Sequence, residues 1–446
     1  MEEKYEHNQH SEFSSEAVMT EASPIAAGRV NTIDEIVALI VSGQSAPFYV
    51  PTLDKLNREQ LTAYTSDGLD PLTILNPVTH SAAYLYFITA RCLEATETNS
   101  MQLYQLLDHF IRQFDPEQVR IAAACFTLIG STLLHLSEVL REPLLPLLSF
   151  RIAIERFAEG ENVLTSLHAP FLRACIRAKA YRYPLYLLDH DIEIIQPNNY
   201  DVNIRNFLEY YYYGAILYIG NKKYDRALEF LTIVISAPTQ QNVVSAIQIA
   251  AYKKFVLASL ITDARIRTLP KYTAPGVEKA CRFHSTAYIN LSKAFEDTNI
   301  HQFNDTLQKS SNVFRGDNHM GLVKQCYQSL RRKKIKELTK VYITVGLEEM
   351  ARKIEDVSPE ELEHILIEMI NQNHIQASIS VTDQHIKMVH FNIVQNEEQQ
   401  KNIEDRILEI STLNDRVAYM NKLEGLNRIF QGKVIVQSRQ SKIHRC

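Results

Sequence analysis

Residues 210–238 read YYYYGAILYIGNKKYDRALEFLTIVISAP and decide the fold class of the chain. The tyrosine run and Ala215 belong to one helical stretch, and Gly220 and Asn221 mark a turn. After the turn, apolar or small residues recur at i, i+3, i+4, i+7 and i+11, which is one face of a second helix: Tyr224, Ala227, Leu228, Leu231 and Ile235. Pro238 ends that helix. The stretch predicts two helices that pack closely because a small alanine lies at their crossing.

This helix pair, over residues 207–238, resembles the tetratricopeptide repeat, whose units of about 34 residues stack into a solenoid. The pieces 178–181 and 184–188 suggest degenerate copies of the same unit. A first helix begins around Val37, Ile40 and Val41, and residues 82–93 and 103–114 predict an antiparallel pair. A long apolar helix is expected over residues 118–140, before Pro143 and Pro146. We therefore predict a mainly α chain with a helical-repeat arm over residues 31–330.

The pattern changes after residue 330. Short helices are expected over 335–342 and 347–354, and a third begins at Ser358, which has proline at the next position and Glu361 to complete a capping box. Ala377, Ile379 and Val381 then alternate as in a half-buried strand, and a second strand is expected over 388–391. Three helices followed by a β-hairpin predict a winged helix over residues 331–395.

The last predicted helix covers residues 397–426. Its apolar residues form a short seam with a period near 3.5: Ile403, Ile410, Leu413, Val417 and Met420. Two interpretations stay open, since the seam either folds back on its own winged helix or enters a bundle built from several subunits. Residues 1–30 are an acidic segment predicted to be disordered, and residues 432–446 are a basic tail that is either loose or docks on an acidic partner.

Helix pairs capped by a winged helix resemble the PCI domain, which subunits of the proteasome lid, the COP-nine signalosome and a translation initiation factor share. Five segments carry a closer resemblance, to third-subunit members of the signalosome group: YYYYG at 210–214, KKYDRALEF at 222–230, LPKYT at 269–273, DNHMGLVKQC at 317–326 and LTKVYITVGLEEMA at 338–351. The resemblance covers roughly residues 160–395 and places the PCI domain at about 200–395.

The resemblance implies a hetero-oligomeric assembly that removes a ubiquitin-like modifier from cullin ubiquitin ligases, with the chemistry in a different, zinc-dependent subunit. This chain is then a non-catalytic scaffold of the cytoplasm and nucleus. The family architecture and the hairpin predict that Ser380, Val381, Asp383 and the second strand supply a sheet edge to a neighbouring winged helix. The alternatives are a PCI subunit of a related complex or a winged-helix protein that binds nucleic acid.

Composition and motifs agree with a protein that is not an enzyme. The net charge is −5 and the pI about 6.3, which gives no bulk attraction for nucleic acid. The six cysteines are far apart, so reduced thiols are expected and a zinc site is not. The chain has no His-Glu-x-x-His, no His-x-His, no phosphate loop and no Gly-x-Ser-x-Gly elbow, and the pairs His7/His10 and His385/His390 are expected to be solvated. We expect no cofactor.

Two surface motifs have alternative interpretations. The tyrosines at 210–213 could stack bases, but consecutive helical residues point in different directions, so at most two share a surface and the others enter the core. The basic run at 331–334 could contact phosphate or form a solvated helix face. Against nucleic-acid binding, the expected recognition helix over 358–373 holds four glutamates and no lysine or arginine.

Overall fold

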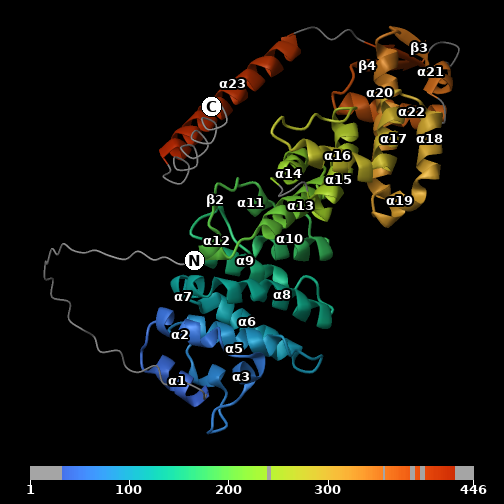
Figure 1. Cartoon of the computed structure of the whole chain (residues 1–446). Helices are drawn as coiled ribbons and strands as arrows, with labels where there is room; N and C mark the ends of the chain where they lie inside the picture. Colours follow the sequence, from blue (N-terminus) through green and yellow to red (C-terminus); the bar gives the residue numbers. More distant parts are fainter. Residues whose placement is uncertain (1–32, 239–242, 355–356, 382–386, 392–396, 427–446) are drawn as a thin grey trace, which may run out of the picture. The chain divides into compact units, whose positions relative to one another are not determined.

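The structure is a computed structural model that describes residues 33–238, 243–354, 357–381, 387–391 and 397–426. The chain divides into two compact units, Met1–Ser292 and Lys293–Cys446, and each is described by itself. Both are mainly helical, as predicted (Figure 1). Among the described helices, none combines the length and the apolar character that crossing a bilayer requires. The acidic and basic end segments, 1–30 and 432–446, lie outside the described residues.

The first unit begins with short helices packed around a buried one. In α5, every residue except Arg91 is buried, and α5 contacts α2, α3, α4 and α6. This burial explains why the sequence of α5 has almost no polar face. The predicted first helix and the predicted pair over 82–93 and 103–114 are confirmed. The helices are α1 (Ile33–Val41), α2 (Ala46–Leu53), α3 (Arg58–Thr62), α4 (Pro71–Ile74), α5 (Ser81–Cys92) and α6 (Ser100–Gln113).

A row of aromatic rings marks the core of this unit. Neighbouring ring centroids are 4.5–5.7 Å apart, within the range of favourable aromatic pairs, along Tyr84, Phe110, Phe114, Phe126, Phe157 and Tyr200. The row connects α5 and α6 with the helices that follow, which are α8 (Ala123–Val139), α9 (Pro146–Phe157) and α12 (Pro197–Tyr200). Successive helices therefore share one continuous core, as expected for a repeat array.

The single helix predicted over residues 118–140 is wrong, because two helices occupy this stretch. α7 (Pro116–Ile121) ends at Ala122, where φ is −108° and ψ is 36°, and α8 begins at the next residue. α7 packs against α2, α5 and α9, whereas α8 packs against α5, α6 and α10 (His168–Arg177). Alanine is the strongest helix former, so Ala122 and Ala123 give no sign of the break. The break between the two helices follows instead from their different packing partners.

The helix pair predicted over residues 207–238 is confirmed as α13 (Ile204–Gly220) and α14 (Tyr224–Ser236). Ala215 and Ala227 are fully buried, but the closest approach occurs at Gly214, where a Cβ atom would lie 2.8 Å from the ring of Phe230. The positive φ of the turn falls on Lys222, at 60°, just after the predicted Gly220-Asn221. The crossing thus needs a residue smaller than the alanine that the repeat pattern predicted.

The prediction of a degenerate copy of the helix pair at 178–181 and 184–188 is largely wrong. α10 stops at Arg177, because the N–H groups of Lys179 and Ala180 turn back to the carbonyls of Ile176 and Cys175, with Lys179 at φ 55°. These two bonds form a Schellman motif, which ends a helix.

The remaining elements of this unit are β1 (Val163–Leu164), α11 (Leu185–Leu188), β2 (Ile194–Ile195), α15 (Ala246–Thr262) and α16 (Pro275–His284), and α17 (Thr286–Glu296) spans the boundary between the units.

The second unit contains the predicted winged helix. Its three strands form an antiparallel sheet in the order β3-β5-β4. Helices α21 and α22 pack on each other, and α21 contacts β3 and β5. The elements are α18 (Ile300–Lys309), α19 (Ser311–Gly316), α20 (Met320–Thr339), β3 (Thr344–Gly346), α21 (Leu347–Ile354), α22 (Pro359–Asn371), β4 (Ala377–Val381) and β5 (Lys387–Phe391), followed by α23 (Glu397–Leu426).

Two details of this unit differ from the prediction. The short helix expected over 335–342 is wrong, since Ile335 and Leu338 end the 20-residue helix α20 and β3 begins at Thr344. Ser358 does cap α22, accepting from the Glu361 N–H at 3.2 Å, but the Glu361 carboxylate pairs with Arg331. α20 also continues through residue 330, which is the predicted end of the helical-repeat arm. The predicted domain boundaries stay a prediction.

Candidate interaction surfaces

The edge strand of the winged helix is the first candidate surface. β4 lies at one edge of the sheet, and β5 is the central strand, paired on both sides. The prediction that the second strand shares the exposed edge is therefore wrong. Ser380 and Val381 lie on β4, with Val381 61% exposed, and Asp383 lies outside the described residues.

The hydrogen-bonding direction along β4 follows from one contact on β5. The N–H of Phe391 donates to the Ile343 carbonyl at 2.8 Å, toward β3. Backbone groups alternate in direction along an antiparallel strand, so His390 and Met388 face β4. Their partners are Ser378 and Ser380, whose N–H groups thus point inward. The outward donors of the edge are Ala377, Ile379 and Val381.

The side chain of Ser380 takes part in a polar row across the sheet. Its hydroxyl lies 2.8 Å from Nε2 of His390, and Nδ1 of the same ring lies 3.1 Å from the hydroxyl of Thr344. His390, expected to be solvated, instead connects all three strands on one face. Its predicted companion His385 lies outside the described residues.

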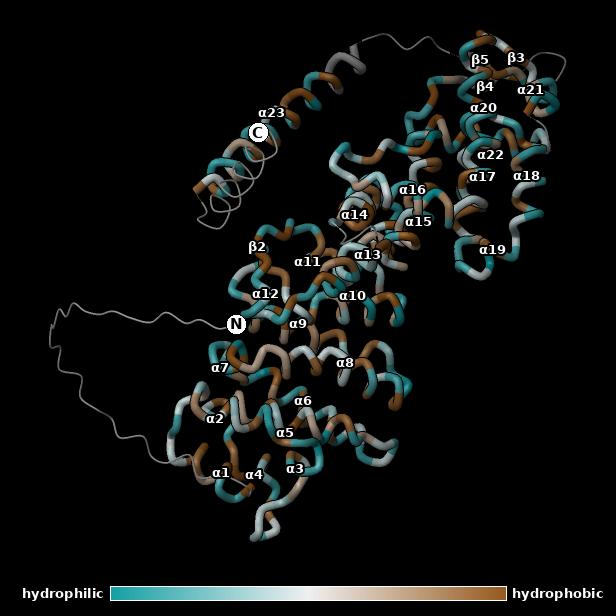
Figure 2. Tube along the Cα trace, in the orientation of Figure 1, coloured by the Kyte–Doolittle hydropathy of each residue, from teal (hydrophilic) through white to brown (hydrophobic). Residues whose placement is uncertain are grey.

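The second candidate surface is α23. Its bounds are those predicted, and every side chain from Ile403 to Leu426 is exposed. At about 100° per residue, the predicted seam residues share one side of the helix with Ile407. A second apolar group lies on the opposite side: Leu408, Tyr419, Leu423 and Leu426, each more than half exposed. In Figure 2, brown and teal segments alternate along α23.

Three residues of the basic run at 331–334 contact other helices of the second unit instead of forming a solvated face. Arg331 and Arg332 of α20 pair with Glu361 and Glu368 of α22 at 2.6 and 2.9 Å. Lys333 donates to the carbonyls of Phe295 and Glu296, 3.1 and 2.9 Å away, at the end of α17. The run therefore fastens the helices of the second unit to one another.

The expected recognition helix is less acidic in effect than its sequence suggests. Besides the two pairs with α20, Glu363 pairs with Lys387 of β5 at 2.7 Å. Three of the four glutamates on α22 are thus neutralised within the fold. α22 still carries no lysine or arginine of its own, so it offers no cation to a phosphate backbone.

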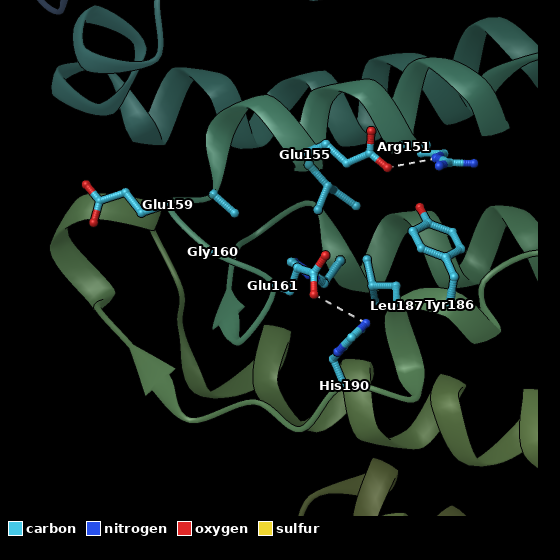
Figure 3. Close-up of a pocket in the computed structure, with 11 residues that line it drawn as sticks. Arg151, Glu155, Glu159, Gly160, Glu161, Tyr186, Leu187 and His190 are labelled. Carbon is cyan, nitrogen blue, oxygen red and sulfur yellow. Dashed lines mark hydrogen bonds and ion pairs between the residues drawn. The ribbon is translucent and has the colours of Figure 1, made fainter.

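A cavity of about 390 Å³ lies beside α9, α10 and α11 (Figure 3). Two polar pairs line it, with Arg151 2.8 Å from Glu155 and His190 3.4 Å from Glu161. A further lining residue, His168, is 2% exposed, and burial lowers its pKa to about 4.

His168 has a structural role in this cavity wall. Its Nδ1 accepts the N–H of Thr165 at 3.0 Å, so the ring is neutral and fixes the start of α10. The Thr165 hydroxyl lies 2.8 Å from the same nitrogen, but Thr165 is only 1% exposed. A substrate cannot reach this pair, and the cavity carries no catalytic assignment.

The thiols and acidic groups offer no reactive or metal-binding site in the described part of the chain. Burial raises the pKa of the thiols of Cys92, Cys125 and Cys175 to about 12 and that of Cys281 to about 11, which keeps them protonated. No cluster of three His, Cys, Asp or Glu side chains among the described residues is arranged to hold a metal ion.

Segments of both units match known protein families. Residues 52–277 match the family model described as COP9 signalosome complex subunit 3, N-terminal helical repeats, and residues 291–392 match the PCI domain. The COP9 signalosome complex subunit 3 of Arabidopsis thaliana is 29% identical over 368 residues, covering 81% of this chain and 84% of the plant protein. Its counterpart in Dictyostelium discoideum is 28% identical over 306 residues, covering 68% and 72%. The matched segments run from the end of α2 to the end of β5.

Proposed function

Because the chain belongs to the family of COP9 signalosome complex subunit 3, we propose that it is a non-catalytic scaffold subunit of a signalosome. In this role it supports the removal of a ubiquitin-like modifier from cullin ubiquitin ligases, while another subunit performs the hydrolysis. We expect it to act in the cytoplasm and nucleus. The five cysteines that are free in the described residues support this location, because thiols stay reduced in these compartments.

The exposure of α23 is the observation that carries the scaffold role. A lone amphipathic helix gains most of its stability from packing its apolar face, and this helix has large apolar side chains on two opposite sides. A helix with apolar residues on both sides fits the interior of a bundle, with neighbours on each side. The proposed anchor residues are Ile403, Ile410, Leu413, Val417 and Met420, joined by the opposite group Leu408, Tyr419, Leu423 and Leu426.

The β4 edge is the second proposed contact. Ile379 and Val381 present outward N–H and C=O groups that a strand from a neighbouring winged helix can pair with. The two surfaces would work together, because the edge fixes the orientation of the winged helix and α23 supplies apolar area.

Purification of the tagged full-length chain from cells, with identification of the co-eluting subunits, tests the proposal. Signalosome subunits and cullin-directed isopeptidase activity in the eluate are expected. The isolated chain should cleave no modified cullin and hold no stoichiometric zinc. Co-elution of proteasome-lid subunits instead, or chelator-sensitive cleavage by the pure chain, would contradict it.

A further inference from the structure

A hollow of about 660 Å³ opens where two turns of the first unit meet. One turn follows α10 and the other joins α13 to α14, and α10 packs against α13 (Figure 1). Residues 179–183 and 220–222 line the hollow. Three of these lining residues are cations, Lys179, Arg182 and Lys222, and none is an aspartate or glutamate. It is called the basic hollow below.

Direct contacts hold the two turns together. The Asn221 side-chain amide donates to the Tyr181 carbonyl at 2.7 Å and to the Leu217 carbonyl at 2.8 Å. The Tyr181 ring lies against Gly220, where a Cβ atom would be 2.9 Å from it. The backbone positions that carry the cations of both turns are therefore fixed relative to one another.

The three cations of the basic hollow are not balanced within the fold. Lys179, Arg182 and Lys222 are exposed, and none of them makes an ion pair with another residue that the structure describes. Their neighbours in the sequence behave differently, since Arg177 pairs with Glu138 and Lys223 lies 3.5 Å from Asp189.

The backbone of the first turn adds two unused donors. Among the described residues, no protein acceptor takes the N–H groups of Tyr181 and Arg182, whereas the next N–H, of Tyr183, donates to the Ala180 carbonyl at 3.2 Å. The segment that lines the hollow therefore holds backbone as well as side-chain donors for an anion.

The ends of α10 and α13 explain only part of this charge. Lysine next to a helix C-terminus is favourable, because that end carries about half a negative charge. Two such ends offset about one of the three positive charges and leave an excess of about two. The turns themselves do not call for lysine, since Lys179 and Lys222 have φ of 55° and 60°, where glycine or asparagine is favoured.

We infer that the basic hollow binds the phosphate group of a phosphorylated serine or threonine in a segment of a partner protein. A phosphorylated side chain carries a charge of about −1.5 to −2 at pH 7, which matches the excess, whereas a carboxylate carries only one charge. Arg182 offers a guanidinium fork for two phosphate oxygens, and the lysines add point charges.

The nearby tyrosine run at 210–213 does not favour nucleic acid as the source of the phosphate. Tyr210 and Tyr211 are 0% and 8% exposed, so the expectation that at most two of the four share a surface is confirmed. Lys254 lies over the Tyr212 ring, 5.1 Å from its centroid. A stacked base needs an open ring face.

The test measures fluorescence anisotropy of a short labelled alanine and glycine peptide that carries one phosphoserine, with the full chain. Saturable binding that weakens as salt rises is expected. Binding should be about tenfold weaker or absent when serine or glutamate replaces phosphoserine.

Lys179→Asn with Lys222→Asn removes two cations and keeps a residue that tolerates positive φ. This variant should bind the phosphopeptide about tenfold more weakly with an unchanged melting temperature. The matched control is Arg141→Asn with Lys271→Asn, which removes two exposed cations outside the basic hollow, one of them at φ 57°, and should bind like wild type. Arg182→Lys keeps the charge but loses the fork and should weaken binding about threefold.

Several results would overturn the inference. They are no binding by the wild-type chain, equal losses in the hollow and control variants, and equal binding of the glutamate peptide. Competition by inorganic phosphate at the affinity of the peptide would assign the basic hollow to a free anion, and tighter binding of a single-stranded oligonucleotide would assign it to nucleic acid. The inference stands apart from the proposed function, because its readout is peptide binding by the purified chain.

Discussion

Phe230 lies so close to Gly214, where α14 crosses α13, that a methyl group at residue 214 would be 2.8 Å from its ring. The same methyl group would lie 3.1 Å from the side chain of Leu188. Both neighbours are buried, so neither can swing into solvent. The contact fixes how closely the central helix pair of the first unit packs.

Gly214→Ala should therefore lower the free energy of unfolding of the first unit by about 1 kcal/mol. Overpacking costs about 1–3 kcal/mol, and the better helix propensity of alanine returns up to about 1 kcal/mol. Gly321→Ala is the matched control, because a Cβ there meets nothing within 4 Å, and it should be neutral or slightly stabilising. Denaturant titration of the full chain measures both variants; a stabilised Gly214→Ala would show that the crossing has room to relax.

Acid should destabilise the first unit through His168. Burial lowers its folded-state pKa from 6.5 to about 4. Between these values the unfolded chain binds a proton that the folded chain does not, so stability is full above pH 6.5 and is lost as pH falls toward 4. The loss amounts to at most about 3 kcal/mol.

His168→Asn isolates this contribution, since asparagine can still accept the Thr165 N–H but does not titrate. Its unfolding free energy, measured in denaturant at several pH values, should fall less steeply than that of wild type between pH 6.5 and 4. Parallel curves for the two proteins would mean that the ring becomes protonated without cost in the folded state.

Val381→Pro should weaken assembly without unfolding the winged helix. The substitution removes an outward N–H and leaves the bonds between β4 and β5 in place. Val381→Thr keeps the N–H and serves as the control. Ser380→Pro should behave differently, because it removes an inward donor and lowers the melting temperature itself. Co-purification with tagged partners and thermal unfolding are compared; full assembly of a folded Val381→Pro variant would argue that β4 is not a partner edge.

Both apolar sides of α23 should be needed for assembly. Ile410→Asp with Val417→Asp changes one side, and Leu408→Asp with Leu423→Asp changes the other. Each pair should release the chain from its partners, since burying such side chains contributes about 1.5–3 kcal/mol apiece.

The melting temperature of the isolated chain should stay nearly unchanged in both double variants, because the side chains are exposed. Ser411→Asp with Lys422→Asp, on a polar part of the same helix, should assemble normally. If only one of the two apolar double variants releases the chain from its partners, only that side of α23 contacts them.

Periodic features were predictable from the sequence, and long-range ones were not. The repeat in residues 210–238 and the last helix had clear helical spacing, and both agree with the structure. Strand β3 is only three residues long, too short for an alternating pattern. The ion pairs of Arg331 and Arg332 join residues 30 and 36 positions apart, which no local pattern reveals.

The candidate surfaces were predicted in part. The heptad spacing predicts the seam of α23, but Leu408 and Leu423 lie on the opposite side of the helix and do not fit that spacing. The direction of the Ser380 N–H depends on the register with β5, and a shift of one residue would reverse it.

The exposed apolar sides of α23 also have a consequence for how the cell must handle this polypeptide. A copy that lacks its partners keeps ten large aliphatic or aromatic side chains of one helix in water. An exposed apolar surface of this kind favours aggregation and binding by chaperones and proteases. On the proposed anchoring role, copies made in excess of their partners are the ones cleared, so the cellular abundance of the polypeptide would be set by the supply of its neighbours.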